Sequence, residues 1–322
     1  MPRLKVLSML SLATSLVVPA ALAQPTNTAR PGTINYVEGQ ATLNGQTLAA
    51  KSSGEVLGQG KTVETQNGKV EVLLTPGVFL RVGADSAITM VSPDLEKTEV
   101  RVDRGTAEIE VDQIFKQNDL LVDQGSAQTK LLKTGLYEFD ANAGDVRVFD
   151  GEVAVLPNPD ANTWVKVKAH HVLSAHDTSH HPQKFDADEY AKNDGLYSWS
   201  KLRADYLGQA NQELAERYAG QPGVYPGWFW NPGLYAYTWL PGDGLFWSPF
   251  GYGFYSPYYI WGGGFIYPHY RILPGYVHGP YRGGYIGHGG YVGHPGYEGH
   301  VAPAPHVQSG GAMHGGFHGG RR

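Results

Sequence analysis

Three acidic residues, Glu108, Glu110 and Asp112, alternate with apolar residues along one predicted strand. Paired carboxylates can act as the acid and the base or nucleophile of a glycoside hydrolase when the fold holds them at the required separation. Side chains at every second position of a strand point to one face, so the three carboxylates are expected to share a face. The pattern favours a solvated outer face. A hydrolase is a third functional class, and it would need a pocket of convergent acids.

The segment Gly58–Thr62 ends like a phosphate-binding loop. That motif needs a glycine at position 55, where this chain has Glu55, and a helix after Lys61 whose amide groups converge on the phosphates. Here the lysine leads instead into a short polar stretch and an Asn-Gly turn. No serine has the flanking glycines of a hydrolase elbow either. The sequence therefore indicates neither nucleotide binding nor serine hydrolase chemistry.

Histidines gather after the last predicted strand and again near the C-terminus. The members of the two groups are His170, His171, His176, His180 and His181, and then His288, His294, His300, His306, His314 and His318. Neutral imidazoles are good ligands for zinc, copper or nickel. No acidic or thiol ligand recurs at a regular spacing beside them, so solvated histidines are the default and a loose, low-affinity site is the alternative. We predict no catalytic residue, no cofactor-binding residue, no metal ligand and no cofactor.

The scaffold that must position these residues is a strand, glycine turn, strand unit that recurs between residues 33 and 156. Apolar and polar residues alternate in it, and each turn contains a glycine, which can adopt the positive φ of a tight hairpin turn. The clearest units are residues 36–43, 70–80, 100–109 and 146–155. The pattern predicts an all-β domain, an antiparallel β-sandwich or β-roll, over residues 33–183. Its last strands are expected at 164–168 and 171–175.

The N-terminal residues have the features of a secretory signal peptide. Arg3 and Lys5 precede an apolar run over residues 6–18 and the small-residue pattern of residues 21–23. The run is shorter than the roughly 20 residues that span a bilayer, so cleavage is expected rather than anchoring. We predict a signal peptide over 1–23, a leader over 24–32, and an exported mature chain, periplasmic or secreted, without a transmembrane span.

Composition narrows the classes of partner. The chain has no cysteine, which excludes a disulfide framework and thiolate chemistry. Its formal net charge is −5, too small to indicate nucleic acid or an anionic membrane surface as the partner. An exported chain without disulfides must be stabilised by burial alone.

Two segments follow the predicted strands. Residues 184–220 carry one apolar stripe at helical spacing, which predicts an amphipathic helix that packs on the sheet. The stripe consists of Trp199, Leu202, Tyr206, Ala210 and Leu214. Residues 221–322 are rich in glycine, tyrosine, proline and histidine, a composition typical of a disordered low-complexity tail. Its aromatic rings could stack on sugars or associate with envelope proteins, and the sequence does not choose between them.

The order of three segments, residues 60–83, 100–107 and 146–155, resembles the FecR-domain family of bacterial periplasmic proteins. The stretches 199–203 and 246–255 are similar to exported members with an aromatic, glycine-rich C-terminal tail. The resemblance covers roughly residues 33–176 and implies a non-enzymatic sensor or adaptor. Classical members relay signals from an outer-membrane transporter to a cytoplasmic sigma factor through a membrane helix. This chain has a predicted cleavable leader instead, so only the periplasmic interaction module is expected to carry over.

The sequence thus predicts an exported, non-enzymatic adaptor that binds an envelope partner at an exposed sheet edge or by surface contacts. The alternative is an extracellular matrix or polysaccharide-binding protein that acts through the aromatic tail. The expected partner is an envelope protein or a polysaccharide, and not nucleic acid.

Overall fold

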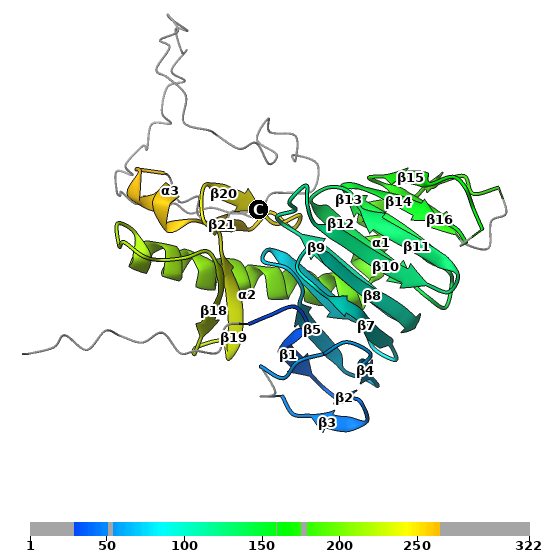
Figure 1. Cartoon of the computed structure of the whole chain (residues 1–322), viewed down its shortest axis with the longest axis horizontal. Helices are drawn as coiled ribbons and strands as arrows, with labels where there is room; N and C mark the ends of the chain where they lie inside the picture. Colours follow the sequence, from blue (N-terminus) through cyan, green and yellow to red (C-terminus); the bar gives the residue numbers. More distant parts are fainter. Residues whose placement is uncertain (1–28, 51–53, 159, 175–178, 265–322) are drawn as a thin grey trace, which may run out of the picture. The chain divides into compact units, whose positions relative to one another are not determined.

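Two β-sheets packed face to face form the main body of the protein (Figure 1). The computed structural model describes residues 29–50, 54–158, 160–174 and 179–264. The eight-stranded sheet has the spatial order β1 (Thr33–Glu38), β5 (Lys69–Leu73), β6 (Val78–Val82), β9 (Thr106–Val111), β12 (Gly135–Asp140), β13 (Asp145–Asp150), β16 (His171–Ser174) and β17 (Gln183–Lys184). The nine-stranded sheet has the order β15 (Val165–Lys168), β14 (Glu152–Leu156), β11 (Ala127–Leu131), β10 (Asp119–Gln124), β8 (Lys97–Arg104), β7 (Ala87–Pro93), β4 (Thr62–Thr65), β2 (Ala41–Leu43) and β3 (Gln46–Leu48). The predicted sandwich-like all-β fold is confirmed.

Alternating aliphatic side chains form the core between the sheets. Val70 and Val72 of β5, Leu80 and Val82 of β6, and Ile109 of β9 are all buried there. Removing each such side chain from water contributes about 1.5–3 kcal/mol to folding. The residues between them point to the opposite face of the eight-stranded sheet, which we call its outer face.

Most of the glycine turns are corners between the two sheets, which corrects the prediction of hairpins. Of the four units, residues 70–80 form an antiparallel hairpin, β5 with β6. At Gly39, Gly105 and Gly151 the chain instead leaves one sheet and enters the other. Gly105 has a φ of +74°, and a Cβ there would lie 2.7 Å from Ser86 Cα. Alternating apolar and polar residues do not distinguish a hairpin from a corner between two sheets, because in both cases every second side chain points into the same core.

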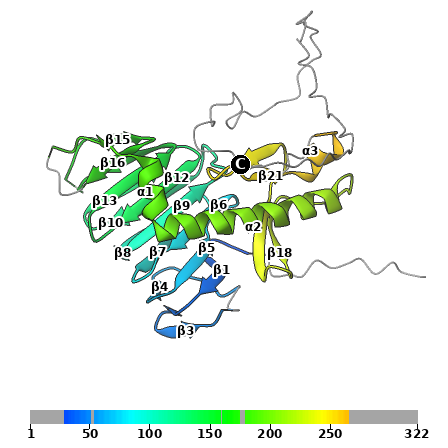
Figure 2. The same ribbon diagram turned by 180° about the vertical axis from the view of Figure 1, so that it is seen from behind.

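Two helices, α1 (Ala187–Asn193) and α2 (Gly195–Tyr218), follow the strands. The carboxylate of Asp186 caps α1 by accepting the Glu189 amide at 2.9 Å, and that of Asp194 caps α2 by accepting the Leu196 amide at 2.6 Å. Helix α2 lies across the outer face of the eight-stranded sheet (Figure 2), so the predicted packing on the sheet is confirmed. Neither helix, nor any other in the described part of the chain, is long and apolar enough to cross a membrane.

The face that α2 buries differs from the predicted stripe. Leu202 and Tyr206 are 48% and 43% exposed, although the other members of the stripe are buried. Polar residues occupy the buried face as well: Ser200, Arg203 and Asn211. The prediction that the whole apolar stripe faces the sheet was partly wrong. The sheet surface beneath α2 is itself polar, so part of the buried face of the helix must be polar too.

Residues 227–261 fold over α2 and the outer face of the sheet, which corrects the prediction that the whole segment from 221 is a low-complexity tail. We call these residues the aromatic cap. Its elements are β18 (Gly227–Asn231), β19 (Ala236–Leu240), β20 (Leu245–Trp247), β21 (Gly253–Tyr255) and α3 (Pro257–Trp261). Trp239, Phe254 and Tyr255 are 0–1% exposed. Trp239 and Phe254 pack with Leu73 and Phe79 of the sheet in a second hydrophobic core.

Two buried asparagine side chains fasten the aromatic cap. Asn35 of β1 accepts the Tyr237 amide at 2.6 Å and donates to the Tyr237 carbonyl at 3.0 Å. Asn211 of α2 does the same for Tyr255, at 2.6 and 3.1 Å. Each side-chain amide thus pairs with a cap strand as a neighbouring strand would, which satisfies buried backbone groups.

Several predicted segments lie outside the described residues. These are the signal peptide over 1–23, the first part of the leader, His176, and the tail from residue 265 with its histidine series. They stay predictions.

Candidate functional site

The three acidic residues at β9 are buried, which corrects the expectation of a solvated face. Glu108 and Glu110 are 0% exposed and Asp112 is 2% exposed. Both oxygens of the Glu110 carboxylate are occupied, one by the Arg81 guanidinium and the other by the Ser248 hydroxyl from the aromatic cap. Among the described residues these carboxylates are therefore closed off from solvent, whereas a glycosidase pair must reach its substrate.

Glu108 belongs to a row of charged residues that crosses five neighbouring strands on the outer face. In the strand register Glu71 of β5 lies opposite Arg81 of β6, and Arg81 lies opposite Glu108 of β9. Glu108 lies opposite Glu138 of β12, which lies opposite Arg147 of β13. We call these five residues the charged row. Directly opposite Cβ atoms are about 4.5–5.5 Å apart, so each charge acts strongly on its neighbours.

Two arginines neutralise one end of the charged row. Arg81 Nε donates to Glu71 Oε2 at 2.9 Å and its Nη1 donates to Glu110 Oε2 at 2.5 Å. From α2, Arg203 Nη2 donates to Glu71 Oε1 at 2.8 Å, and its guanidinium lies 4.1 Å from the centre of the Tyr36 ring. Burial acts to raise the pKa of Glu71, but Arg203 and Arg81 outweigh it and lower that pKa to about 2. Helix α2 is therefore held to the sheet by a buried ion pair.

The other end of the row holds carboxyl groups that favour the protonated form. Burial, reinforced by Glu138, raises the pKa of Glu108 well above its usual range. Burial, reinforced by Asp194, raises the pKa of Glu138 to about 8. Arg147 at 2.9 Å and the Tyr190 hydroxyl at 2.8 Å both donate to Glu138 Oε1 and act in the opposite direction, but more weakly. This end of the row therefore carries less negative charge at neutral pH than its residue types suggest.

Stability should fall as the pH rises through about 8, and Glu138→Gln should reduce that fall. The native protein holds the Glu138 proton up to about pH 8, whereas an unfolded glutamate releases it near 4.5. Between these values the native state binds more protons, so raising the pH favours unfolding. Urea unfolding at pH 5 and pH 9 should show a decrease in the free energy of unfolding that is about 1–3 kcal/mol smaller in Glu138→Gln than in wild type.

Glu152→Gln is the matched control, because Lys133 lowers the pKa of Glu152, the opposite direction from the shift at Glu138. Its free energy of unfolding should change between pH 5 and pH 9 as much as that of wild type. Equal slopes for wild type and Glu138→Gln would contradict a raised pKa at Glu138.

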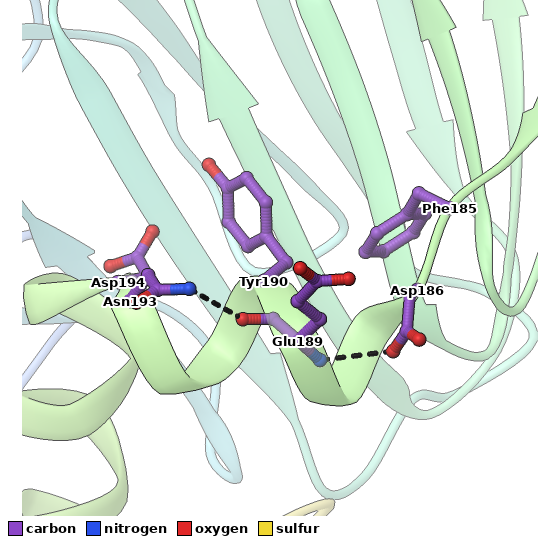
Figure 3. A pocket seen from close by; sticks show the side chains of 6 residues that line it. All are labelled: Phe185, Asp186, Glu189, Tyr190, Asn193 and Asp194. Carbon is purple, nitrogen blue, oxygen red and sulfur yellow. Dashed lines mark hydrogen bonds between the residues drawn. The ribbon is translucent and has the colours of Figure 1, made fainter.

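A groove of about 450 Å³ lies beside α1 at this end of the charged row (Figure 3). Its lining residues are Phe185, Asp186, Glu189, Tyr190, Asn193 and Asp194. Figure 3 shows the Tyr190 ring pointing from α1 towards the strands, where its hydroxyl reaches Glu138. Asp186 and Asp194 already cap the two helices. No group of His, Cys, Asp or Glu among the described residues is arranged to hold a metal ion.

The remaining sequence candidates are not brought together. Gly58–Thr62 leads into strand β4, and its amides bond within the backbone: Gly60 N to Met90 O at 2.8 Å and Lys61 N to Gly58 O at 2.9 Å. They do not converge on a phosphate position. The ring of His171 bonds locally, with Nδ1 2.9 Å from the Ala169 carbonyl oxygen.

The terminal strands of the two sheets differ in how far their outer edges are covered. On β1, Ile34 N donates to Glu55 O at 2.7 Å and Ile34 O accepts from Gly54 N at 2.9 Å, so that edge is occupied. Strands β17 and β3 have two and three residues. Strand β15 has four residues, and within the described ranges no backbone hydrogen bond joins its outer edge to another segment. Among the four terminal strands of the two large sheets, β15 is the longest whose outer edge is open to pairing within the described ranges.

Comparison with known proteins identifies the strand region. The family model described as FecR protein matches residues 61–154. The chain carries a FecR domain. The matched part runs from the start of β4 into β14 and contains the whole charged row, whereas β15, the helices and the aromatic cap lie outside it.

Two solved structures of a candidate anti-sigma factor from Parabacteroides distasonis ATCC 8503 are similar to the chain. One has 16% identity over 42% of this chain and 65% of that chain, with a TM-score of 0.35. The other has 17% identity over 41% of this chain and 63% of that chain, with a TM-score of 0.34. The chain thus covers just under two thirds of the length of these proteins. A search of curated proteins gave no match.

Sequence reasoning missed most of the charged row. A signal was present, since Glu71, Arg81, Glu138 and Arg147 each lie between apolar residues in a strand. Such a pattern equally describes a strand with one wet face. What was needed was the strand register, which places residues far apart in the sequence opposite one another.

Proposed function

We propose that this protein is a non-enzymatic signalling or regulatory adaptor that acts through protein contacts at the cell envelope. The observation that carries the proposal is the FecR-domain match over residues 61–154, because the resemblance to that family implies a sensor or adaptor. Two further features support it. The N-terminal sequence has the signature of an export signal, and the acids that could have served catalysis, Glu108, Glu110 and Asp112, are buried.

The partner binds by adding an extended segment to the outer edge of β15. An edge strand presents unpaired N–H and C=O groups, and main-chain hydrogen bonds to them supply affinity. The backbone pairing between β14 and β15 shows which N–H groups of β15 point towards its open edge. Ala169 N donates to Gly151 O at 3.1 Å, and the opposite pairs then continue as Glu152 with Lys168 and Ala154 with Lys166. Because N–H groups alternate between the two sides of a strand, those of Lys166 and Lys168 face the open edge.

Lys166→Pro removes one outward N–H without breaking the bonds between β15 and β14. The variant should capture about tenfold less partner than wild type, since each lost and sterically blocked main-chain bond costs on the order of 1–3 kcal/mol. The measurement is cross-linking of the full chain in its native cells, followed by mass spectrometry and direct binding of the protein identified.

Lys166→Ala is the matched control, because it removes the side chain and keeps the N–H. It should bind more tightly than Lys166→Pro, and all three forms should unfold with similar midpoints. If Lys166→Pro bound the partner as tightly as wild type, the edge-binding mode would be contradicted. If the intact chain captured no discrete envelope protein, the adaptor function would be refuted.

A second function, polysaccharide binding through the aromatic region, is favoured by one observation. Trp261 and Tyr258 of α3 are 67% and 47% exposed, with ring centroids 6.3 Å apart. Their flat apolar faces with polar tips suit stacking on sugar rings. If this is the function, replacing both with alanine should lower retention on envelope polysaccharide about tenfold, as expected when two stacking rings are lost. Phe115→Ala, at a similarly exposed ring of the FecR-domain region, should have no effect, and equal retention of all forms would refute this candidate.

A further inference from the structure

The open edge of β15 carries an aromatic and basic row of side chains. Trp164, Lys166 and Lys168 occupy every second position and face away from the core, whereas Val167 between them is 0% exposed. The side chain of Lys166 is 66% exposed and Trp164 is 42% exposed. These side chains therefore lie beside any segment that pairs with the outer edge.

The charge around this edge is positive. Glu152 on the neighbouring strand β14 is shared between Lys166 Nζ at 3.4 Å and Lys133 Nζ at 3.2 Å. Lys168 lies directly opposite Glu152 in the register. Three lysines thus surround a single glutamate, and the side chains of Lys166 and Lys133 remain largely exposed, at 66% and 62%. An incoming strand meets unbalanced positive charge.

The same lysines oppose pairing between two copies of this chain. An antiparallel contact between two β15 strands would bring the lysine rows of both copies together, and like charges at opposite positions are destabilising. Lysine on an edge strand is a known device against such self-association. The lysines on the edge of β15 therefore disfavour pairing with a second copy of this chain and favour a partner of opposite charge.

We infer that the β15 edge binds an extended segment of another protein that has carboxylates at alternate positions. The inference rests on the edge-binding mode of the proposed function and adds the chemistry of the partner. Main-chain bonds hold the segment to β15, and its carboxylates pair with Lys166 and Lys168. Opposite-charge pairs across strands contribute about 0.2–1 kcal/mol each, so two pairs set a preference of about tenfold at low salt.

Binding of labelled peptides to the full-length protein, followed by fluorescence anisotropy, tests this. The first probe is a capped peptide of alternating valine and glutamate, the second has lysine in place of glutamate, and the third is the first peptide with every backbone amide N-methylated, which keeps the charges and removes the main-chain donors. Wild type should bind the first about tenfold more tightly than either of the others. The variant K166E/K168E should reverse the preference between the first two probes, and K166Q/K168Q should abolish it.

Each contrary outcome has a distinct meaning. Equal binding of the N-methylated probe would show plain attraction to a polyanion and overturn the inference. An unchanged preference in K166E/K168E, or no binding of the acidic probe to wild type, would overturn it too. If Lys166→Pro still captured about tenfold less of the cellular partner, the edge mode of the proposed function would remain supported despite this failure. If capture were instead insensitive to Lys166→Pro, the proposed mode itself would fail.

Discussion

Replacing Arg81 with methionine is expected to lower the free energy of unfolding by about 3–5 kcal/mol, because a buried ion pair that loses one partner leaves an uncompensated charge. Arg81 is 0% exposed and bonds to the carboxylates of Glu71 and Glu110, which are also 0% exposed. Glu71 would keep Arg203, but Glu110 would keep only the Ser248 hydroxyl. Urea unfolding at pH 7 measures the loss.

Two comparisons separate this effect from a general loss of arginine. Arg101→Ala removes a 46%-exposed side chain paired with Asp103 at 2.6 Å, and such a surface pair should change stability by less than about 1 kcal/mol. The double variant Arg81→Met with Glu110→Leu should regain most of the loss, because it removes the stranded carboxylate and leaves Glu71 paired with Arg203. If Arg81→Met were no more destabilising than Arg101→Ala, the buried row would not have the role assigned to it.

Replacing Trp239 with alanine is expected to cost about 3–5 kcal/mol, the usual range for a large aromatic side chain lost from a core. Trp239 is 0% exposed and packs against Phe254 and Phe246, at ring-centroid distances of 5.5 and 5.1 Å. It also lies over the Gly77 turn of the β5–β6 hairpin, so the cavity would open between the aromatic cap and the sheet. Thermal or urea unfolding of the full chain measures the change.

Trp261→Ala is the control, since Trp261 is 67% exposed and its loss should change stability by less than about 1 kcal/mol. Equal small effects of the two substitutions would show that the aromatic cap is not part of the folded unit.

The burial of the aromatic cap also determines where the chain can be shortened. A chain ending at Gly220 lacks the aromatic cap and exposes Leu73 and Phe79, whereas one ending at Gly264 keeps the second hydrophobic core.

The strands were predictable because their signal is local. Alternation of apolar and polar residues placed β5, β6, β15 and β16 close to their observed bounds. The glycines of the turns were also recognised, for example Gly105 with its φ of +74°. Whether a turn joins two paired strands or two sheets was not predictable, because the hydrogen-bond partners of a strand lie elsewhere in the chain.

The aromatic cap shows the limit of composition. Glycine and proline turns among aromatic residues lack the aliphatic continuity of a core segment, so residues 227–261 were interpreted as part of a tail. Their burial depends on a complementary surface supplied by Phe79 of the sheet and Leu207 of α2. It also depends on Asn35 and Asn211, whose amides bond to β19 and β21 across long sequence separations.

The sequence by itself determined the all-β class, the helix that packs on the sheet and the FecR resemblance, since each rests on short-range periodicity or motif order. Only the tertiary structure decided that Glu108 and Glu110 are covered, that Arg203 lies on the buried face of α2, and that β15 is an open edge. Burial, ion pairing and pKa depend on which distant segments come into contact. A carboxylate between two apolar residues has the same local sequence whether water or an arginine lies above it.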